Sequence, residues 1–262
     1  AQPSRRARTV KHVDIDTTET DQKRIRPIVK ISTSMKAAAF GGVALLALTS
    51  CAANEAGGTD DAASSSSLSG TLVGSGASSQ GSAQEAWIAG FQTANSSVTV
   101  NYDPAGSGAG RETFQQGASA FAGSDRAFKT DEIAAGPFEG CATGDIVEIP
   151  AYISPIAVVF NLDGVDSLNL DAATISKIFS GRITEWNDPA IAALNEGVAL
   201  PDLAITAVHR SDKSGTTGNF TEYLAAAAPD AGTAGAVEEW PSELGGERAA
   251  QTSGLVDAVA NG

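Results

Sequence analysis

Apolar and polar positions follow two different periods along this chain, and the switches between them predict strands that lead into helices. Val98 to Tyr102 alternates residue by residue, as a half-buried strand does, and Ile205 to Val208 has the β-branched character of another strand. A run that carries Trp87, Ile88 and Phe91 has helical spacing. Strands that alternate with helices favour an α/β fold with parallel strands.

Three predicted strands run directly into segments rich in glycine, serine and threonine, and a helix follows each segment. The segments are Gly74 to Gln80 after the strand Thr71 to Val73, Pro104 to Arg111 after Val98 to Tyr102, and His209 to Phe220, where a turn at Ser214 to Thr217 precedes a helix at Phe220 to Ala226. Free N–H groups and the helix dipole make the start of a helix a site for anions. Because the carboxyl ends of parallel strands meet at one crevice, we predict a site for a small oxyanion there.

A fourth segment, Phe121 to Phe128, places Asp125 after a short apolar run. A carboxylate beside an anion site suits an anion that carries a proton of its own. Each feature also has an ordinary structural explanation, because serine and glycine are common turn residues and Ser214 to Thr217 could be only a helix N-cap. The oxyanion prediction therefore depends on the segments acting together.

In the second half of the chain, the pattern predicts a strand and two helices. The strand is Ile156 to Leu162; Asp171 caps a helix that carries Ile175, Ile178 and Phe179; and Pro189 opens a helix with Ile191 and Leu194.

Six motifs follow one another from about Ser69 to the end of the chain. They are G-S-G-A-S-S, Y-D-P-A-G-S-G-A-G, A-G-S-D, I-S-P-I-A-V-V-F-N-L, I-F-S-G-R-I-T-E-W-N-D-P-A-I-A-A-L-N and H-R-S-D-K-S-G-T-T-G-N-F-T-E-Y-L. Together they resemble the substrate-binding lipoproteins of phosphate ABC transporters, the PstS family. The resemblance implies a two-lobe periplasmic-binding-protein fold, type II-like, with the ligand between the lobes. It also implies a first lobe at 69–150 and a second lobe at 151–262, with the chain ending before it returns to the first lobe.

Carried over by position, the resemblance implies that hydroxyl groups, backbone N–H groups, one arginine and one carboxylate bind phosphate. These residues are Ser78, Ser79, Ser107, Asp125, Arg210, Ser214, Gly215 and Thr216, with Asp212 in a supporting role. The family usually has Thr-Phe where this chain has Ser78-Ser79. Ser78 keeps the hydroxyl group, and a backbone N–H at Ser79 requires no particular side chain.

The charged residues of this set have separate roles. The planar guanidinium of Arg210 suits two phosphate oxygens, and Asp212 is placed to hold it and to balance its charge. An ionised Asp125 can only accept hydrogen bonds. Near neutral pH phosphate still has a proton to donate and sulfate has none, so Asp125 is expected to select against sulfate.

Residues 35–51 have the pattern of a lipoprotein signal peptide. A basic start at Met35-Lys36 leads into an apolar run, Ala37 to Leu48, that is too short to span a bilayer, and L-T-S-C ends at Cys51. This ending resembles a lipobox, which implies lipidation of Cys51 and an anchor on the extracytoplasmic face of the cell membrane. Residues 52–68 are expected to be a flexible linker and residues 1–34 a disordered extension, with a basic nucleic-acid arm as the alternative for the extension.

Charge and composition exclude several functions. The chain has 17 Lys and Arg against 31 Asp and Glu, and eight against 27 beyond Cys51, which argues against nucleic-acid binding. His12 and His209 are the only histidines, and no Cys/His cluster has metal-ligand spacing, so we expect no metal. Cys141 is left without an evident partner once Cys51 is lipidated.

We therefore expect a monomeric solute-binding protein that captures inorganic phosphate and delivers it to an ABC transporter permease, with no cofactor and no catalytic residue. A serine-hydrolase elbow does not fit, and Lys213-Ser214 precedes its glycines, which a P-loop lysine does not. Three alternatives stay open: a binding protein for another oxyanion such as sulfate or molybdate, a surface lipoprotein, and a phosphoesterase on the same fold.

Overall fold

The computed structural model describes residues 11–15, 68–232 and 235–262. All of them belong to one compact unit. The predicted signal peptide at 35–51, with its lipidation site Cys51, lies outside the described residues, as do residues 52–67 of the predicted linker at 52–68 and most of the extension at 1–34. In the described part of the chain, no helix is both long and apolar enough to cross a membrane.

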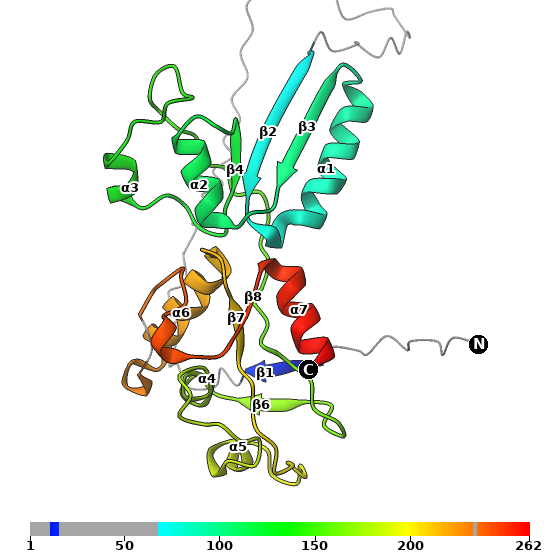
Figure 1. Cartoon of the computed structure of the whole chain (residues 1–262), viewed down its shortest axis with the longest axis vertical. Coiled ribbons are helices and arrows are strands. Elements are labelled where there is room, and N and C mark those ends of the chain that lie inside the picture. The colour runs from blue at the N-terminus through cyan, green and yellow to red at the C-terminus, as the bar shows by residue number, and fades with distance from the viewer. Residues whose placement is uncertain (1–10, 16–67, 233–234) are drawn as a thin grey trace, which may run out of the picture. The chain divides into compact units, whose positions relative to one another are not determined.

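The first sheet consists of three parallel strands in the order β3-β2-β4 (Figure 1). β2 (Gly70–Gly76) pairs with β3 (Val98–Asp103) and with β4 (Phe121–Gly123). The short 3-10 helix η1 (Ser78–Gln80) and α1 (Gly81–Ala94) follow β2, α2 (Ser107–Gln115) follows β3, and α3 (Thr130–Ala134) lies beyond β4. We refer to β2 through α3 as the first lobe. The predicted strand at Val98 to Tyr102 and the helix with Trp87 are confirmed.

Glycine allows α2 to lie directly against β2. A Cβ atom on Gly110 would come within 2.4 Å of the Gly76 Cα atom and 2.7 Å of the Ser75 carbonyl oxygen. Gly76 itself has a φ of 149°, which L side chains rarely adopt, and its carbonyl accepts a 2.8 Å hydrogen bond from the Gly106 N–H. The glycine-rich segments thus fix the distance between the strand and the helix that carries Ser107.

The elements from β5 through α7 form the second lobe. Its helices are α4 (Ala172–Phe179), α5 (Pro189–Leu194), α6 (Gly215–Ala227), the short 3-10 helices η2 (Pro229–Ala231) and η3 (Ser242–Leu244), and α7 (Gln251–Asn261). Two strands, β7 (Val208–Arg210) and β8 (Glu247–Ala249), pair in parallel. β5 (Val159–Phe160) and β6 (Leu168–Leu170) belong to a separate small sheet.

A hydrophobic core lies within the second lobe. Leu168, Ile175 and Ile191 are almost completely buried, and Phe160 and Leu224 pack in the same cluster. Burying a side chain of this size stabilises the fold by roughly 1.5 to 3 kcal/mol.

Helix starts in this lobe follow the predicted caps. The Asp171 carboxylate accepts a 2.6 Å hydrogen bond from the Thr174 N–H, and the Asp188 carboxylate accepts one of 2.8 Å from the Ala190 N–H, with Pro189 at the first helical position. Both predicted helix starts are confirmed.

Two predicted strands are wrong in extent. β7 contains only Val208 of the predicted strand Ile205 to Val208, because the Ile205 N–H donates to the Thr184 carbonyl (2.7 Å) outside any named strand. β5 contains only Val159 and Phe160 of Ile156 to Leu162. β-branched composition favours extended backbone, but it does not decide which backbone lies alongside to pair with it.

The expectation that residues 1–34 are disordered is wrong for Lys11–Ile15. These residues form β1, which pairs antiparallel with β5 and parallel with β6 and lies between them in the sheet. Strand pairing satisfies backbone N–H and C=O groups whatever the side chains are. The register places Val13 opposite Leu168 and Ile15 opposite Leu170.

Candidate functional site

Asp125 is the centre of a cluster of hydroxyl groups that come from both lobes. Ser79 in η1 donates a 2.5 Å hydrogen bond to the Oδ1 atom of Asp125, and Thr216 in α6 donates one of 3.1 Å to the Oδ2 atom of Asp125. Ser107, at the start of α2, is 3.4 Å from Oδ2 and also accepts a 3.2 Å bond from the Asp125 N–H. Side chains up to 91 positions from Asp125 in sequence therefore meet at its carboxylate.

The N-terminus of α6 reaches this cluster because Gly215 has no side chain. A Cβ atom there would lie 2.6 Å from the Ser107 Oγ atom and 2.8 Å from the Asp125 Cβ atom. Ser214 is the N-cap, and its hydroxyl accepts a 3.3 Å hydrogen bond from the Thr217 N–H. The predicted turn at Ser214 to Thr217 is thus the cap and first turn of the helix, which starts at Gly215 and not at Phe220.

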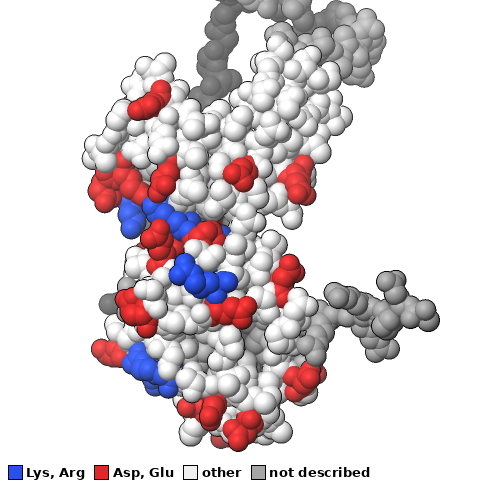
Figure 2. Space-filling model, in the orientation of Figure 1, with Lys and Arg blue, Asp and Glu red and all other residues white. Residues whose placement is uncertain are grey.

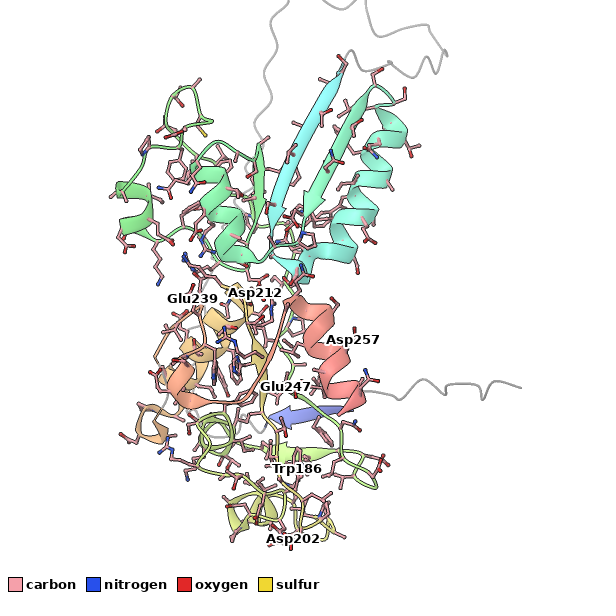
Figure 3. All side chains as sticks on the ribbon, in the orientation of Figure 1. Trp186, Asp202, Asp212, Glu239, Glu247 and Asp257 are labelled. Carbon is pink, nitrogen blue, oxygen red and sulfur yellow. The ribbon has the colours of Figure 1, made fainter. Side chains whose placement is uncertain are left out.

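Arg210, at the end of β7, is 5% exposed and is held by Asp212 through two hydrogen bonds. Its Nε donates to Asp212 Oδ1 at 2.8 Å, and its Nη2 donates to Oδ2. Burial acts to raise the pKa of Asp212, but hydrogen bonds from Arg210 and from backbone N–H groups such as that of Gln251, together with the charge of Arg210, hold this pKa below its ordinary value. The supporting role of Asp212 stays a prediction; Figure 3 shows Asp212 near the first lobe.

The same geometry narrows the predicted role of the Arg210 guanidinium. Arginine has five N–H donors, and the edge formed by Nε and one Nη2 hydrogen faces Asp212. The other edge, with Nη1 and the second Nη2 hydrogen, is the one left for an anion. Nη1 lies 3.5 Å from the Thr252 hydroxyl.

Thr252 is a site residue that the sequence analysis missed. Its N–H donates a 3.1 Å hydrogen bond to the Ser78 hydroxyl, and its own hydroxyl lies 3.1 Å from the same Ser78 oxygen. Thr252 is in the first turn of α7, directly after β8. A strand followed by a polar helix start was the available signal, but this junction has no glycine between strand and helix.

Asn219 was also missed. Its Nδ2 atom donates to the Asp125 carbonyl at 3.1 Å and to the Gly215 carbonyl at 2.9 Å. It lies one helical turn after Gly215 in α6, so it ties the first turn of the helix to the backbone of the first lobe.

Two tyrosines hold the backbone at Ala77 and Ser79, at the start of η1. Tyr102 donates to the Ala77 carbonyl at 3.0 Å, and Tyr152 donates to the Ser79 carbonyl at 3.2 Å. Burial first, and then the charge of Asp125, raises the pKa of both phenols, so both stay protonated donors at neutral pH.

A cavity of about 690 Å³ opens beside these groups, and both lobes contribute to its walls. Ser79, Asp125, Arg210 and Thr216 line it together with Thr252, while much of the remaining wall is apolar. Ser107, with 1% of its surface exposed, contacts the Asp125 carboxylate and N–H beside this cavity. The structure thus brings Ser107, Asp125 and Arg210 to one place, as the resemblance implied.

On the face drawn in Figure 2, acidic side chains cover more area than basic ones. The face drawn in Figure 2 is mostly uncharged or red, and Lys and Arg occupy only a few small areas of it. This matches the excess of Asp and Glu in the sequence. The long-range field of such a surface repels anions, so binding of one here would depend on the short-range donors inside the cavity.

Residues 61–261 match the family described as the PBP superfamily domain, and the chain belongs to this family. It is 43% identical over 175 residues to the phosphate-binding protein PstS3 of Mycobacterium bovis, a match that covers 67% of this chain and 47% of that protein. It is 36% identical over 233 residues to the phosphate-binding protein PstS2 of the same organism, covering 83% and 60% of the two chains. The predicted resemblance is confirmed, and the chain spans about half the length of these relatives.

The fold has a solved counterpart. A Clostridium perfringens protein crystallised with bound phosphate superposes with a TM-score of 0.55 at 22% identity, covering 72% of this chain and 66% of that one. Together with the family match, this superposition confirms the predicted α/β, periplasmic-binding-protein fold.

Proposed function

We propose that this protein captures inorganic phosphate between its two lobes and delivers it to the permease of an ABC transporter. The observation that carries the proposal is the position of Asp125, an acceptor that receives hydrogen bonds from Ser79, Ser107 and Thr216. Donor groups gathered around one carboxylate suit an anion that needs many donors and also offers a proton.

The donors divide into hydroxyl groups, backbone amides and one guanidinium. Charge-assisted hydrogen bonds from such groups contribute about 1.5 to 3 kcal/mol each, so several together suffice for tight binding. The proposed ligands are Ser78, Ser79, Ser107, Asp125, Arg210, Ser214, Gly215 and Thr216. Asp212 positions Arg210 through the contacts described above.

Ligand binding then exchanges one set of contacts for another. The hydroxyl groups of Ser79 and Thr216 already point at Asp125, so their rotamers are ordered before phosphate arrives. A protonated phosphate oxygen donates to the Asp125 carboxylate, and the hydroxyls turn to the other oxygens. Sulfate has no proton for the carboxylate and leaves two acceptors facing each other in a buried site.

The relatives named phosphate-binding proteins support this proposal, and so does the Clostridium perfringens protein that holds phosphate. We propose a monomeric binding protein without catalytic residue, cofactor or metal. We further propose that it works on the extracytoplasmic face of the cell membrane, anchored by a lipid on Cys51 after cleavage before this residue, which also separates β1 from the anchored chain. The supporting observation for the anchor is the sequence pattern at 35–51.

Isothermal titration of the purified chain with phosphate and with sulfate tests the function. Saturable binding of one phosphate per chain, with sulfate at least about 100-fold weaker, is the expected result. Equal or tighter binding of sulfate or molybdate would assign the site to another oxyanion. Release of phosphate from a phosphoester such as p-nitrophenyl phosphate would identify an enzyme and contradict the proposal.

A further inference from the structure

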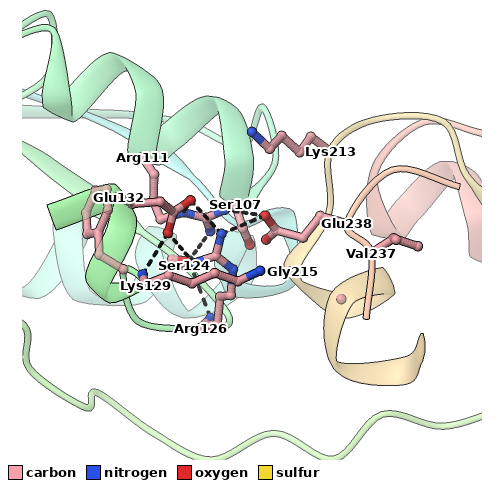
Figure 4. A network of polar contacts seen from close by, with 12 residues as sticks. Ser107, Arg111, Ser124, Arg126, Lys129, Glu132, Lys213, Gly215, Val237 and Glu238 are labelled. Carbon is pink, nitrogen blue, oxygen red and sulfur yellow. Dashed lines mark hydrogen bonds and ion pairs between the residues drawn. The ribbon is translucent and has the colours of Figure 1, made fainter. Parts of the chain in front are cut away.

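A network of charged side chains joins the two lobes beside the anion site (Figure 4). Arg111 in α2 and Arg126, just after β4, both donate from Nη2 to the Oε2 atom of Glu238, at 2.5 and 2.9 Å. Arg126 also forms two hydrogen bonds of 2.6 and 2.7 Å to Glu132 in α3. Three of the four residues belong to the first lobe, and Glu238 alone comes from the second.

The contact that crosses between the lobes is buried. Only 4% of the Arg111 side chain and 10% of the Glu238 side chain are exposed. Burial acts to raise the pKa of Glu238, but Arg126 and Arg111 outweigh it and keep this pKa below its ordinary value, so the carboxylate is charged at neutral pH. While the lobes are in contact, the positive charges of the two arginines balance the negative charges of Glu132 and Glu238.

Glu238 is also bonded to the helix that presents the proposed phosphate ligands. Its backbone carbonyl accepts a 3.0 Å hydrogen bond from the N–H of Ser214, the N-cap of α6. The neighbouring residue, Val237, exchanges two 3.0 Å hydrogen bonds with the Thr221 hydroxyl in the same helix. A Cβ atom on Gly218 would lie 3.0 Å from the Glu238 Cγ atom, so the glutamate side chain lies against the first turns of α6.

A second ion pair between the lobes provides a contrast. Lys213 donates to Glu112 at 3.0 Å, but 36% and 59% of their side chains are exposed. Exposed pairs of this kind contribute little because water and salt screen them. Removing one partner of a buried pair leaves the other charge buried and unpaired, and this mainly accelerates dissociation.

We propose that Glu238 is a positioning residue that holds the two lobes closed over the anion by pairing with Arg111 and Arg126. Resting on the proposed function, the inference adds a determinant of phosphate affinity that does not contact phosphate. Glu238 acts through the start of α6: when its carboxylate is held by the first lobe, Gly215 and Thr216 are held against Asp125. If the lobes part, Arg111 and Arg126 share the single carboxylate of Glu132.

The test compares Glu238→Gln with the exposed control Glu112→Gln, both in the full chain. Stopped-flow and chase measurements with phosphate give the association and dissociation rate constants. For Glu238→Gln we expect the dissociation rate constant to rise about 10- to 100-fold with the association rate constant changed less than about threefold. For Glu112→Gln both constants should stay within about threefold of the unsubstituted protein.

We call the pairing of Glu238 with Arg111 and Arg126 the latch. A double-substitution cycle distinguishes loss of the latch from a general loss of stability. Arg126→Gln alone should also accelerate dissociation, and Arg126→Gln combined with Glu238→Gln should change the rate by clearly less than the product of the two single effects. Independent, multiplicative effects would contradict a direct pairing. A dissociation rate for Glu238→Gln within twofold of the unsubstituted protein would overturn the proposal.

Hydrogen exchange without phosphate distinguishes failure of this inference from failure of the proposed function. The Ser214 and Gly218 amides at the start of α6 should exchange faster in Glu238→Gln than in Glu112→Gln. If the unsubstituted protein does not bind phosphate but this difference is present, the latch stands and the proposed function fails. If phosphate binds and neither exchange nor dissociation changes, the function stands and the latch fails; if phosphate does not bind and exchange does not change, both fail.

Discussion

Thr216 and Asp125 belong to different lobes, and the Thr216 hydroxyl donates a 3.1 Å hydrogen bond to the Asp125 carboxylate. Thr216 is in the first turn of α6, whereas Asp125 follows the last strand of the first sheet. The bond joins a helix start, with its free N–H groups, to an acceptor that no simple anion site would contain. That pairing underlies the selectivity expected of the site.

Asp125→Asn should reduce the preference for phosphate over sulfate by about 10- to 100-fold. The amide can donate to a sulfate oxygen, which removes the repulsion between two acceptors, and it receives the phosphate proton less well than a carboxylate does. Titration calorimetry with both anions measures the ratio. Asp145→Asn, at an exposed position, is the matched control and should leave the ratio unchanged. An unchanged ratio in Asp125→Asn would show that selectivity comes from another group.

Arg210→Lys should weaken phosphate binding by about 10- to 100-fold although the positive charge remains. A lysine cannot occupy both Asp212 oxygens and still present an edge of donors to the anion, as the Arg210 fork can. The dissociation constant for phosphate is the quantity to measure. Arg248→Lys changes an exposed arginine on β8 in the same way and should bind phosphate normally. Near-normal affinity in Arg210→Lys would remove Arg210 from the proposed ligands.

Gly110→Ala should lower the free energy of unfolding by about 1 to 3 kcal/mol and weaken phosphate binding as well. The added methyl group would lie 2.4 Å from the Gly76 Cα atom, so α2 must move away from β2 and take Ser107 with it. Urea denaturation and phosphate titration measure the two effects. Gly90→Ala is the control, because a Cβ atom there has no neighbour within 4 Å and alanine favours the helix. If Gly110→Ala binds phosphate normally, Ser107 does not need its observed position.

Acid should destabilise the protein partly through Glu132. Hydrogen bonds from Arg126 are the main reason that the pKa of Glu132 falls from 4.5 to about 2. A carboxylate whose pKa is lower in the folded state contributes stability above its unfolded pKa and loses it as the pH falls through the folded value. Between pH 4.5 and pH 2 the unsubstituted protein should therefore lose more stability than Glu132→Gln does. Urea denaturation across this range measures the difference, with the exposed Glu85→Gln as control. Parallel pH profiles for Glu132→Gln and the unsubstituted protein would show that Glu132 does not contribute to the loss of stability in acid.

Local chemistry made several features predictable from the sequence. The caps at Asp171 and Asp188 act on N–H groups only two or three positions away, so the residues that make each contact are close together in the chain. The strand-to-helix junctions at Gly74 to Gln80 and Pro104 to Arg111 were found because glycine and hydroxyl residues cluster there. Asp125 stood out because a carboxylate is unusual beside such junctions.

Contacts between distant segments could not be predicted in the same way. Thr252 touches Ser78 across 174 positions, and no spacing rule relates a helix start near the end of the chain to a loop in the first lobe. The extents of β5 and β7, and the presence of β1, depend on which backbone lies alongside each strand.

The sequence by itself determined the α/β alternation, the helix caps and most of the residues around the anion site, because each depends on side chains and backbone groups a few positions apart. Only the tertiary structure decided that Thr252 meets Ser78, 174 positions away, and that Glu238 meets Arg111, 127 positions away. A buried ion pair depends on two side chains reaching the same place in the folded chain. That meeting is a property of the packed lobes and not of either sequence segment.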